Sequence, residues 1–218
     1  MKIIKRPEPI DKEIVLDPFR TIMSKTDKKG IIEFANDYFM EVSGYKEWEL
    51  MAQPHNVIRH PDMPKIMFKI LWDRLLNGQN IHAVVKNLAK DGRYYWVVTD
   101  FQIKYNDKGE IIALYSRRKA IPEKVKHFFD SLYQKLLQIE QSGGMEASGF
   151  YLTNYLEDVG MTYDEFLLNL FGLSEKQLMD YMRAQISDAQ LDGSFAVSAE
   201  QAIQKTTKKK GFIKRLFS

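Results

Sequence analysis

Between residues 20 and 190, apolar residues alternate or recur at helical spacing, and the polar breaks between them divide the chain into elements. Two short strand-like runs flank the turn Asp27-Lys28-Lys29-Gly30, which predicts a hairpin. Short helices are predicted over 37–43 and 47–51. A longer helix is predicted over 63–75, where apolar residues recur every three or four positions. Three further strands are predicted over 81–88, 94–103 and 111–118.

This order of elements predicts an α+β fold. The strands are expected to form a five-stranded antiparallel sheet with helices on one face, and a ligand pocket between the sheet and the helices. A C-terminal helical extension follows. It begins with a helix over 122–141 that ends at Ser142-Gly143-Gly144, and shorter helices follow within 149–190. Capping boxes at Thr162 to Glu165 and Ser174 to Gln177 mark two helix starts in this region.

The same pattern divides the chain into six segments. They are an N-terminal arm, a sensor domain, a connecting helix, a helical extension of unknown role, a flexible linker and a basic amphipathic tail; the connecting helix and the helical extension together make up the C-terminal extension. Their bounds are 1–19, 20–120, 121–142, 145–190, 191–207 and 208–218. The short helices of the extension bury little area alone, so we expect them to pack on the sensor domain or on a partner.

Composition narrows the class of protein. The chain has 218 residues and no cysteine, which excludes disulfides, thiolate metal sites and iron-sulfur clusters. We expect no metal site. The net charge of +3 is too small to indicate nucleic acid. No apolar run approaches the roughly 20 residues of a spanning helix, and residues 1–9 lack a signal-peptide core, so we expect a cytoplasmic protein. No catalytic constellation is present, so we do not expect an enzyme.

The last eleven residues, 208–218, carry five basic side chains and no acid. In a helix, four apolar residues of this tail share one face: Phe212, Ile213, Leu216 and Phe217. Such a segment, with its basic residues from Lys208 to Arg215, is suited to an anionic bilayer, here the inner face of the cytoplasmic membrane. The alternative is a frayed, solubilising tail.

Residues 54–64 concentrate polar chemistry in one loop. They include two histidines, Arg59, Asp62 and three prolines, and prolines at this density indicate a shaped loop. Asp62 followed by Pro64 fits a helix cap and first turn. The amides at that helix start favour an anionic group such as phosphate. The alternative is a helix entry with solvated charges.

Several segments resemble the PAS domain of Aer-type aerotaxis and energy-taxis receptors and of CetB-like stand-alone PAS sensors. The resemblance covers about residues 20–120, and nothing after residue 142. General PAS features lie in Ala35-Asn36-Asp37 and Val42-Ser43-Gly44-Tyr45. The segments specific to this branch are Arg59-His60-Pro61-Asp62-Met63-Pro64 and Val85-Lys86-Asn87.

The resemblance implies a PAS fold, a non-covalently bound FAD that reports redox or electron-transport state, and signalling to a membrane chemoreceptor. It also ties the loop residues Arg59, His60 and Asp62 to FAD binding. Arg59 offers a planar cationic fork for pyrophosphate. As alternatives, Arg59 pairs only with Asp62, and His60 is a structural hydrogen-bonding group.

Two asparagines complete the candidate set of cofactor-binding residues. Strand alternation places Asn87 on the pocket side, where its amide suits the polar edge of an isoalloxazine ring, and turns His82 away. Because His82 then faces away from the pocket, a heme with His82 as its iron ligand is disfavoured. Asn36 is a weaker candidate because a helix-cap role already explains it. Ile81 stands where the family usually has a tryptophan, so stacking from that position is absent.

Two other functions stay open. One is a ligand-free PAS adaptor that acts by protein-protein contacts through Phe128, Phe129 and the helices of 149–190. The other is a sensor of heme or another small molecule. A second copy of the chain, forming a PAS homodimer, is a further candidate partner.

Overall fold

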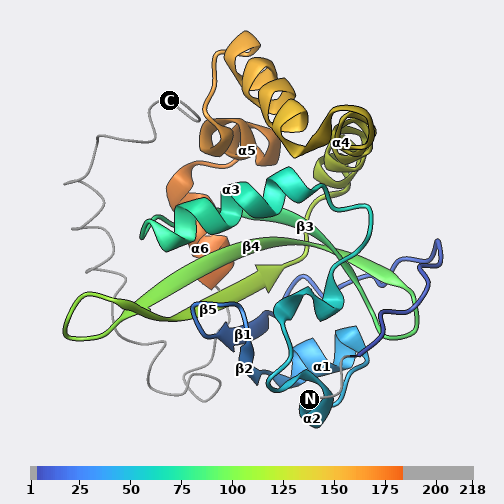
Figure 1. Cartoon of the computed structure of the whole chain (residues 1–218), viewed down its shortest axis with the longest axis vertical. Coiled ribbons are helices and arrows are strands. Elements are labelled where there is room, and N and C mark those ends of the chain that lie inside the picture. Colours follow the sequence, from blue (N-terminus) through green and yellow to red (C-terminus); the bar gives the residue numbers. More distant parts are fainter. Residues whose placement is uncertain (1–3, 184–218) are drawn as a thin grey trace.

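Five antiparallel strands form a single sheet in the order β2-β1-β5-β4-β3 (Figure 1). The structure is a computed structural model and describes residues 4–183. The strands are β1 (Ile22–Thr26), β2 (Ile32–Ala35), β3 (Ala83–Leu88), β4 (Tyr94–Tyr105) and β5 (Ile111–Lys119). The helices are α1 (Asp37–Ser43), α2 (Glu47–Leu50), the 3₁₀ turn η1 (His55–Ile58), α3 (Lys65–Leu76), α4 (Glu123–Asp158), α5 (Tyr163–Phe171) and α6 (Glu175–Arg183). The predicted α+β fold with a five-stranded antiparallel sheet is confirmed.

Local turn chemistry explains the first hairpin. The Asp27 carboxylate accepts hydrogen bonds from the backbone amides of Lys29 and Ile31, at 2.8 and 2.9 Å. Gly30 has a φ of +81°, a conformation that favours glycine. β1 then pairs with β2 on one side and with β5 on the other, which joins the two ends of the sensor domain.

The inner face of the sheet packs against the helices that follow β2. Ser24 of β1 and Arg118 of β5 contact His55 of η1, and the His55 ring stacks on Phe39 of α1, with ring centroids 5.9 Å apart. Polar side chains therefore line the interior that these helices enclose.

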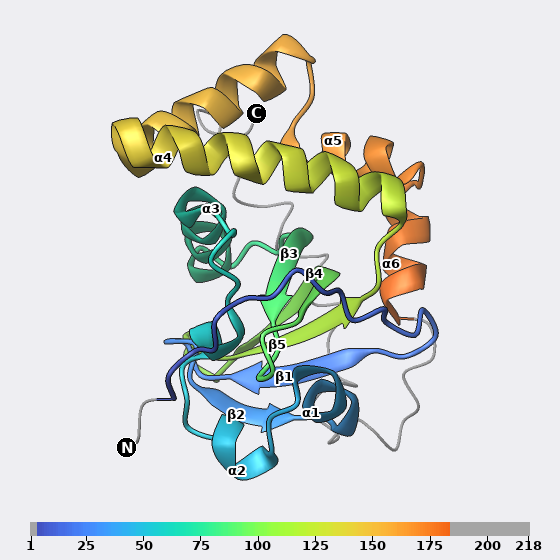
Figure 2. The same ribbon diagram turned by 90° about the vertical axis from the view of Figure 1, so that its right-hand side faces the viewer.

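The outer face of the sheet packs against the C-terminal helices. Trp96 of β4 stacks on Tyr133 of α4, with ring centroids 6.0 Å apart. Tyr181 of α6 donates a hydrogen bond to the carbonyl of Ala120, just beyond β5, at 2.9 Å. Figure 2 shows α4 on the opposite side of the strands from α1 and α2. The sheet is thus covered on both faces, and residues of the extension belong to the same buried cluster as the strands.

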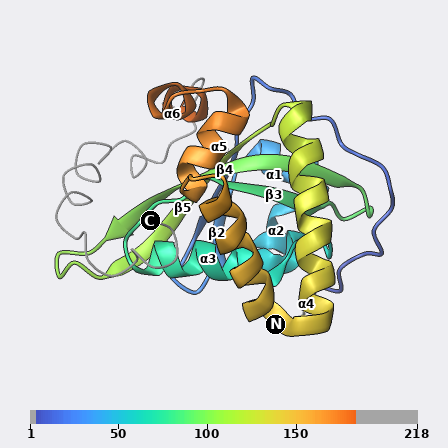
Figure 3. The same cartoon turned by 90° about the horizontal axis from the view of Figure 1, so that it is seen from above.

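A reversal at Gly144 divides α4 into two halves. Its φ of 79° and ψ of 177° lie in a region that is essentially limited to glycine. The second half of α4 returns beside the first, as Figure 3 shows from above. The predicted capping boxes are present: Thr162 and Glu165 open α5, and Ser174 and Gln177 hydrogen-bond in the same way before α6.

The N-terminal arm lies along the turn between β3 and β4. Ile14 donates to the carbonyl of Tyr94 at 2.7 Å, and the Tyr94 amide donates to Lys12 at 3.1 Å. Glu13 forms an ion pair of 2.7 Å with Lys126 of α4. The arm therefore contacts both the sensor domain and the extension.

No helix within residues 4–183 has the length and apolar character needed to cross a membrane. The predicted linker (191–207) and amphipathic tail (208–218) lie outside the described residues. The end of the predicted extension, 184–190, lies outside them as well.

We expect the substitution Tyr133→Phe to lower the free energy of unfolding by about 1 kcal/mol. The Tyr133 hydroxyl donates a 2.6 Å hydrogen bond to the carbonyl of Val84 in β3, and the side chain is buried. Urea unfolding of the full chain measures the change. Tyr151→Phe, on an exposed position of α4, is the matched control and is expected to change stability by less than about 0.5 kcal/mol. Equal urea midpoints for Tyr133→Phe and the wild type would show that this bond does not hold α4 on the sheet.

Candidate functional site

The proline-rich loop of residues 54–64 passes the free edge of the sheet. The backbone of Arg59 forms an antiparallel bridge with Asn87 of β3, the strand at that edge. On one side of this bridge η1 directs His55 toward the inner face, and on the other His60 lies beside Tyr94. The structure therefore brings the predicted residues Arg59 and Asn87 together through their backbones.

The guanidinium of Arg59 is half-buried at the start of α3. It donates to the carbonyl of Met63 at 2.9 Å and lies 4.0 Å from the ring centroid of Phe68. Burial lowers the pKa of Arg59, and the nearby carboxylate of Glu140 opposes that shift. Within residues 4–183 Arg59 forms no ion pair, so it does not pair with Asp62.

His60 and Asp62 lie on the outer side of β3. The Asp62 carboxylate is 2.8 Å from the ammonium of Lys86, which also lies 3.5 Å from Asp130 of α4. The Nδ1 atom of His60 accepts a hydrogen bond from the Asp62 amide at 3.1 Å. Burial lowers the pKa of His60 to about 4, so its ring is neutral at pH 7. These two loop residues therefore contact α4 through Lys86 and lie away from the inner face.

The prediction that Asp62 caps the following helix is wrong. α3 begins at Lys65, and Pro64 occupies the cap position without a side-chain hydrogen bond. The carboxylate of Glu140 in α4 accepts from the amides of Lys65 and Ile66, at 3.0 and 2.9 Å. Asp62 precedes the helix by three positions, and the buried ammonium on β3 attracts its carboxylate.

The inner face of the sheet holds a buried arginine. Arg118 of β5 donates to the hydroxyls of Ser116 and Ser24 at 2.6 and 3.1 Å, and to Nε2 of His55 at 2.7 Å. Burial lowers the pKa of Arg118 to about 10, so the group stays charged at pH 7. Burial also lowers the pKa of His55 well below its usual value, and the charge of Arg118 adds to that shift. No carboxylate forms an ion pair with Arg118 in the described part of the chain.

Other buried polar atoms share this interior. The Asn87 side-chain nitrogen and the hydroxyls of Tyr95, Tyr45 and Thr99 have no hydrogen-bond partner among the described residues. Asn87 and Tyr95 face each other across β3 and β4, and Thr99 is paired in register with Arg118. An unsatisfied buried polar group costs about 1–3 kcal/mol, so this set needs a physical explanation.

A cavity of about 10 Å³ lies between α3 and β3. It is lined by Met63, Met67, Phe68, Leu71, Ala83, Val84 and Val85. Pockets that hold cofactors measure roughly 300 Å³ or more. A group of that size fits in this cavity only if α3 and the loop before it move away from the sheet.

Asn36 connects β1 to α1. Its side-chain oxygen accepts from the amides of Phe39 and Met23, at 3.0 and 2.9 Å, and its nitrogen donates to the carbonyl of Thr21 at 2.9 Å. The structure does not bring Asn36 into contact with Arg59, His60 or Asp62. Its side chain forms a helix cap and a cross-link to β1.

Sequence reasoning missed His55, Ser116 and Arg118 as inner-face residues. Alternation along β5 could have placed two of them on the inner face, because Ser116 and Arg118 share a face with the buried Leu114. The contact of Glu140 with α3 joins residues about 75 positions apart. Local pattern gives no signal for such a contact.

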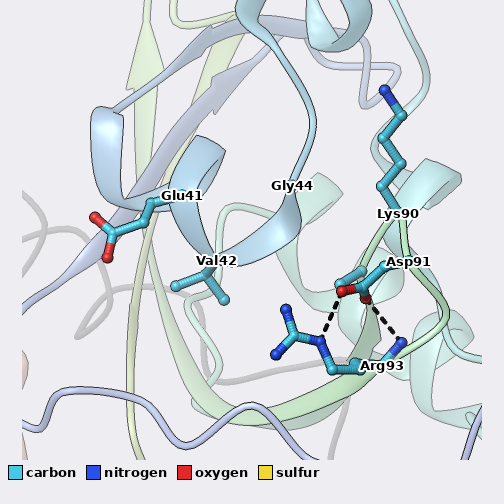
Figure 4. A pocket seen from close by; sticks show the side chains of 7 residues that line it. Glu41, Val42, Gly44, Lys90, Asp91 and Arg93 are labelled. Atoms are coloured by element: carbon cyan, nitrogen blue, oxygen red, sulfur yellow. Dashed lines mark hydrogen bonds and ion pairs between the residues drawn. The ribbon is translucent and has the colours of Figure 1, made fainter.

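A second concavity, of about 430 Å³, lies on the surface between the end of α1 and the turn joining β3 to β4 (Figure 4). It is lined by Glu41, Val42, Gly44, Ala89, Lys90, Asp91 and Arg93. Asp91 and Arg93 pair with each other at 2.7 Å, and Glu41 pairs with Arg20 at 2.7 Å. Its charges are thus largely satisfied within the chain, unlike the donors of the inner face.

Comparison with known proteins agrees with the observed fold of the sheet and its helices. Residues 32–116 match the family model described as the PAS fold. A stretch of 77 residues is 51% identical to the aerotaxis receptor of Escherichia coli K12 and covers 35% of this chain and 15% of the receptor. The predicted PAS domain of the aerotaxis-receptor type is therefore confirmed.

More distant relatives include a nitrogen fixation regulatory protein of Klebsiella pneumoniae. It is 29% identical over 89 residues, 41% of this chain and 18% of that protein. Another is the biofilm dispersion protein BdlA of Pseudomonas aeruginosa, 22% identical over 120 residues, 55% of this chain and 28% of that protein. The chain spans less than a third of the length of these curated relatives. A solved light-oxygen-voltage domain matches 53% of this chain and 89% of its own length, with a TM-score of 0.47 and 17% identity.

We expect the stability of the wild type to fall by about 2 kcal/mol more than that of His60→Gln between pH 7 and pH 4.5. The folded pKa of His60 is about 4, against about 6.5 in the unfolded chain. The unfolded chain therefore binds the proton first as the pH falls, so the stability present above pH 6.5 is lost toward pH 4. Urea unfolding across this range measures the difference, and His55 contributes equally to both proteins. Parallel stability curves would show that His60 titrates normally in the fold.

Proposed function

We propose that the chain is a PAS-type redox and energy-taxis sensor that binds FAD non-covalently and signals to a separate chemoreceptor. The observation that carries the proposal is the inner face of the sheet, where the charged Arg118 lacks a carboxylate partner within residues 4–183. The similarity to the aerotaxis receptor supports the taxis role. The nitrogen fixation and biofilm dispersion relatives support a role in signal transduction.

The donors of the inner face suit the polar edge of an isoalloxazine ring. That edge presents carbonyl oxygens and ring nitrogens that accept hydrogen bonds, and one ring N–H that donates. Arg118 supplies a planar fork of donors, and Asn87 and Tyr95 carry buried polar atoms without partners in the described chain. A bound flavin would supply one- and two-electron redox chemistry. The residues of the chain would orient it and exclude water.

Flavin binding requires the interior to open. The cavity of about 10 Å³ beside α3 is far smaller than an isoalloxazine ring. The wall that must move consists of α3 and the loop of residues 54–64, since the strands opposite are fixed in the sheet. A movement of this wall would carry the state of the pocket to α4, which packs on α3.

The small cavity favours a second candidate, a ligand-free adaptor that acts by protein-protein contacts. Its predicted contact residue Phe129 is buried, and Phe128 packs on Phe166 with ring centroids 5.2 Å apart. These residues hold the extension together, so an adaptor would use other surfaces. A heme sensor is less favoured, because His82 is on the outer side, 3.7 Å from the carboxylate of Asp100.

We assign the chain no catalytic reaction. The relatives named above are a receptor, a nitrogen fixation regulatory protein and a biofilm dispersion protein. Signalling by this chain would therefore proceed through contacts with a membrane chemoreceptor or another signalling protein.

We expect the purified chain to bind FAD with the visible absorption of a flavoprotein. Asn87→Asp and Arg118→Lys should each weaken binding about tenfold, because one loses amide donors and gains negative charge, and the other loses the planar fork. Flavin fluorescence titration of the full chain measures the affinities. Arg93→Lys, in the surface concavity, is the matched control and should leave affinity unchanged.

Three outcomes of these experiments would contradict FAD binding at the inner face. A chain that stays colourless with added FAD favours the adaptor. A Soret band favours heme. Wild-type affinity in Asn87→Asp and Arg118→Lys would place the flavin away from the inner face.

The tail of residues 208–218 is proposed to bring the sensor to the inner face of the cytoplasmic membrane. We expect the intact chain to co-sediment with vesicles that contain anionic phosphatidylglycerol, and a chain ending at Lys205 to remain in solution. Each basic residue near such a surface contributes about 1 kcal/mol, and the contribution falls as salt is added. Neutral phosphatidylcholine vesicles are the control. Equal sedimentation of the two chains on anionic vesicles would remove the tail as an anchor.

A further inference from the structure

The second half of α4, residues 145–158, carries an aromatic face that no described element covers. Phe150 is 71% exposed and Tyr151 is 36% exposed, whereas Leu152 and Leu156 on the other side of the helix are buried. Figure 2 shows this half of α4 at the top of the molecule, with α3 and the sheet beneath it. The two rings therefore point away from the core and meet solvent.

Three carboxylates border these rings on the same helix. Glu146 precedes Phe150 by four positions and Glu157 follows it by seven, so the three side chains share one side of the helix. Asp158 follows Tyr151 by seven positions in the same way. All three acids are exposed, and within residues 4–183 none of them forms an ion pair. The face thus combines two aromatic rings with unpaired negative charge.

This combination limits what can cover the face. An anionic bilayer would accept the aromatic rings but would repel the three carboxylates. The described part of the C-terminal extension, residues 121–183, carries ten acidic and five basic side chains, so its net charge is −5. A suitable occupant must therefore be basic as well as apolar.

The chain supplies such an occupant beyond the described residues. The tail of residues 208–218 has five basic side chains, no acid, and four apolar residues that would share one face of a helix. Eleven helical residues measure about 16 Å, and the helix from Glu146 to Asp158 rises about 18 Å. The two segments match in length, in charge and in apolar content.

The tail is long enough in its connection to reach this face. The 24 residues 184–207 separate it from Arg183, the last residue described. A chain of that length spans about 80 Å when extended, whereas a compact domain of about 180 residues is about 40 Å across. Such a tether also gives a roughly millimolar effective concentration, so a weak contact is enough to hold the tail.

We propose that the outward face of the second half of α4 is an intramolecular docking site for the tail of residues 208–218. The apolar side of the tail covers Phe150 and Tyr151, and its basic residues pair with the three carboxylates. The docking itself is independent of flavin binding. Its consequence rests on the proposed membrane role of the tail, because the same side chains contact either this face or a bilayer. The docked tail is therefore withheld from the membrane.

The first test places a spin label at the end of the tail. The chain has no cysteine, so Ser218→Cys provides a single attachment site. In the full labelled chain, the amide NMR signals of residues 146–158 should broaden, because docking brings the label close to them. Phe150→Ser should remove most of this broadening. Phe19→Ser, at a position of the N-terminal arm that is 66% exposed, is the matched control and should leave the broadening unchanged.

Vesicle binding supplies a second readout. Only the undocked tail binds a bilayer, so the apparent affinity is the intrinsic affinity multiplied by the undocked fraction. Phe150→Ser and Glu157→Gln should each raise the affinity of the full chain for phosphatidylglycerol vesicles about threefold. Phe19→Ser and Asp107→Asn, both at exposed positions of other segments, are the matched controls and should leave it unchanged.

The outcomes separate docking from the membrane role. Absence of broadening in residues 146–158, or broadening confined to another surface, overturns the inference and leaves the proposed membrane role standing. Broadening together with unchanged vesicle affinity in Phe150→Ser confirms the docking site and overturns the competition. Broadening together with failure of every chain to bind vesicles confirms the docking site and removes the membrane role.

A mixed sample identifies the source of the tail. It combines isotope-labelled chains that lack the spin label with spin-labelled chains that lack the isotope. Unbroadened signals in this sample support docking within one chain. Broadening as strong as in the single labelled chain shows that the tail of a second copy occupies the face, which overturns the intramolecular proposal.

Discussion

The burial of a charged guanidinium inside the sheet is the constraint on which the rest of this site depends. Arg118 lies on a face that would otherwise hold an apolar core, and two serine hydroxyls and a neutral histidine solvate it. Desolvation of a charge is expensive, and these neutral acceptors offset only part of it. The register of β1 on β5 is tied to this arrangement, because it sets Ser24 opposite Ser116. The inner face therefore has the character of a binding site although side chains fill it.

The sheet separates this interior from a second polar cluster on its outer face, formed by Asp62, Lys86 and Asp130. α3 contacts both the inner cavity and the C-terminal extension. The helix closes the inner cavity with Met67 and Leu71, and its first turn meets Glu140 of the extension. Any change in the separation of α3 and the sheet must therefore alter the packing of α4. This mechanical link needs no flexible hinge, because a close-packed interior transmits displacement.

Most elements could be predicted because their signals are local. The turn at Gly30, the cap at Asn36 and the capping box at Thr162 are each built from residues within four positions of one another. Alternation also predicted that Asn87 and His82 lie on opposite faces of the sheet. The site was less predictable, because its partners come from distant segments. Asp62 had a plausible local role as a cap, but the ammonium on β3 and the carboxylate on α4 replaced that role with non-local contacts.

The two histidines of the loop of residues 54–64 lie on opposite faces of the sheet. His55 lies inside against Arg118, and His60 lies outside beside Asp62 and near Lys86. Burial lowers the pKa of both, so neither ring carries charge at pH 7. The charges near the loop are then those of Arg59, Asp62, Arg118 and Lys86. A change of charge inside the pocket would act directly on Arg118, and the backbone bridge between Arg59 and Asn87 joins the loop to the strand that carries Lys86. Coupling across the sheet edge thus depends mainly on movement of the proline-rich loop. The rigidity of that loop determines how strong the coupling is.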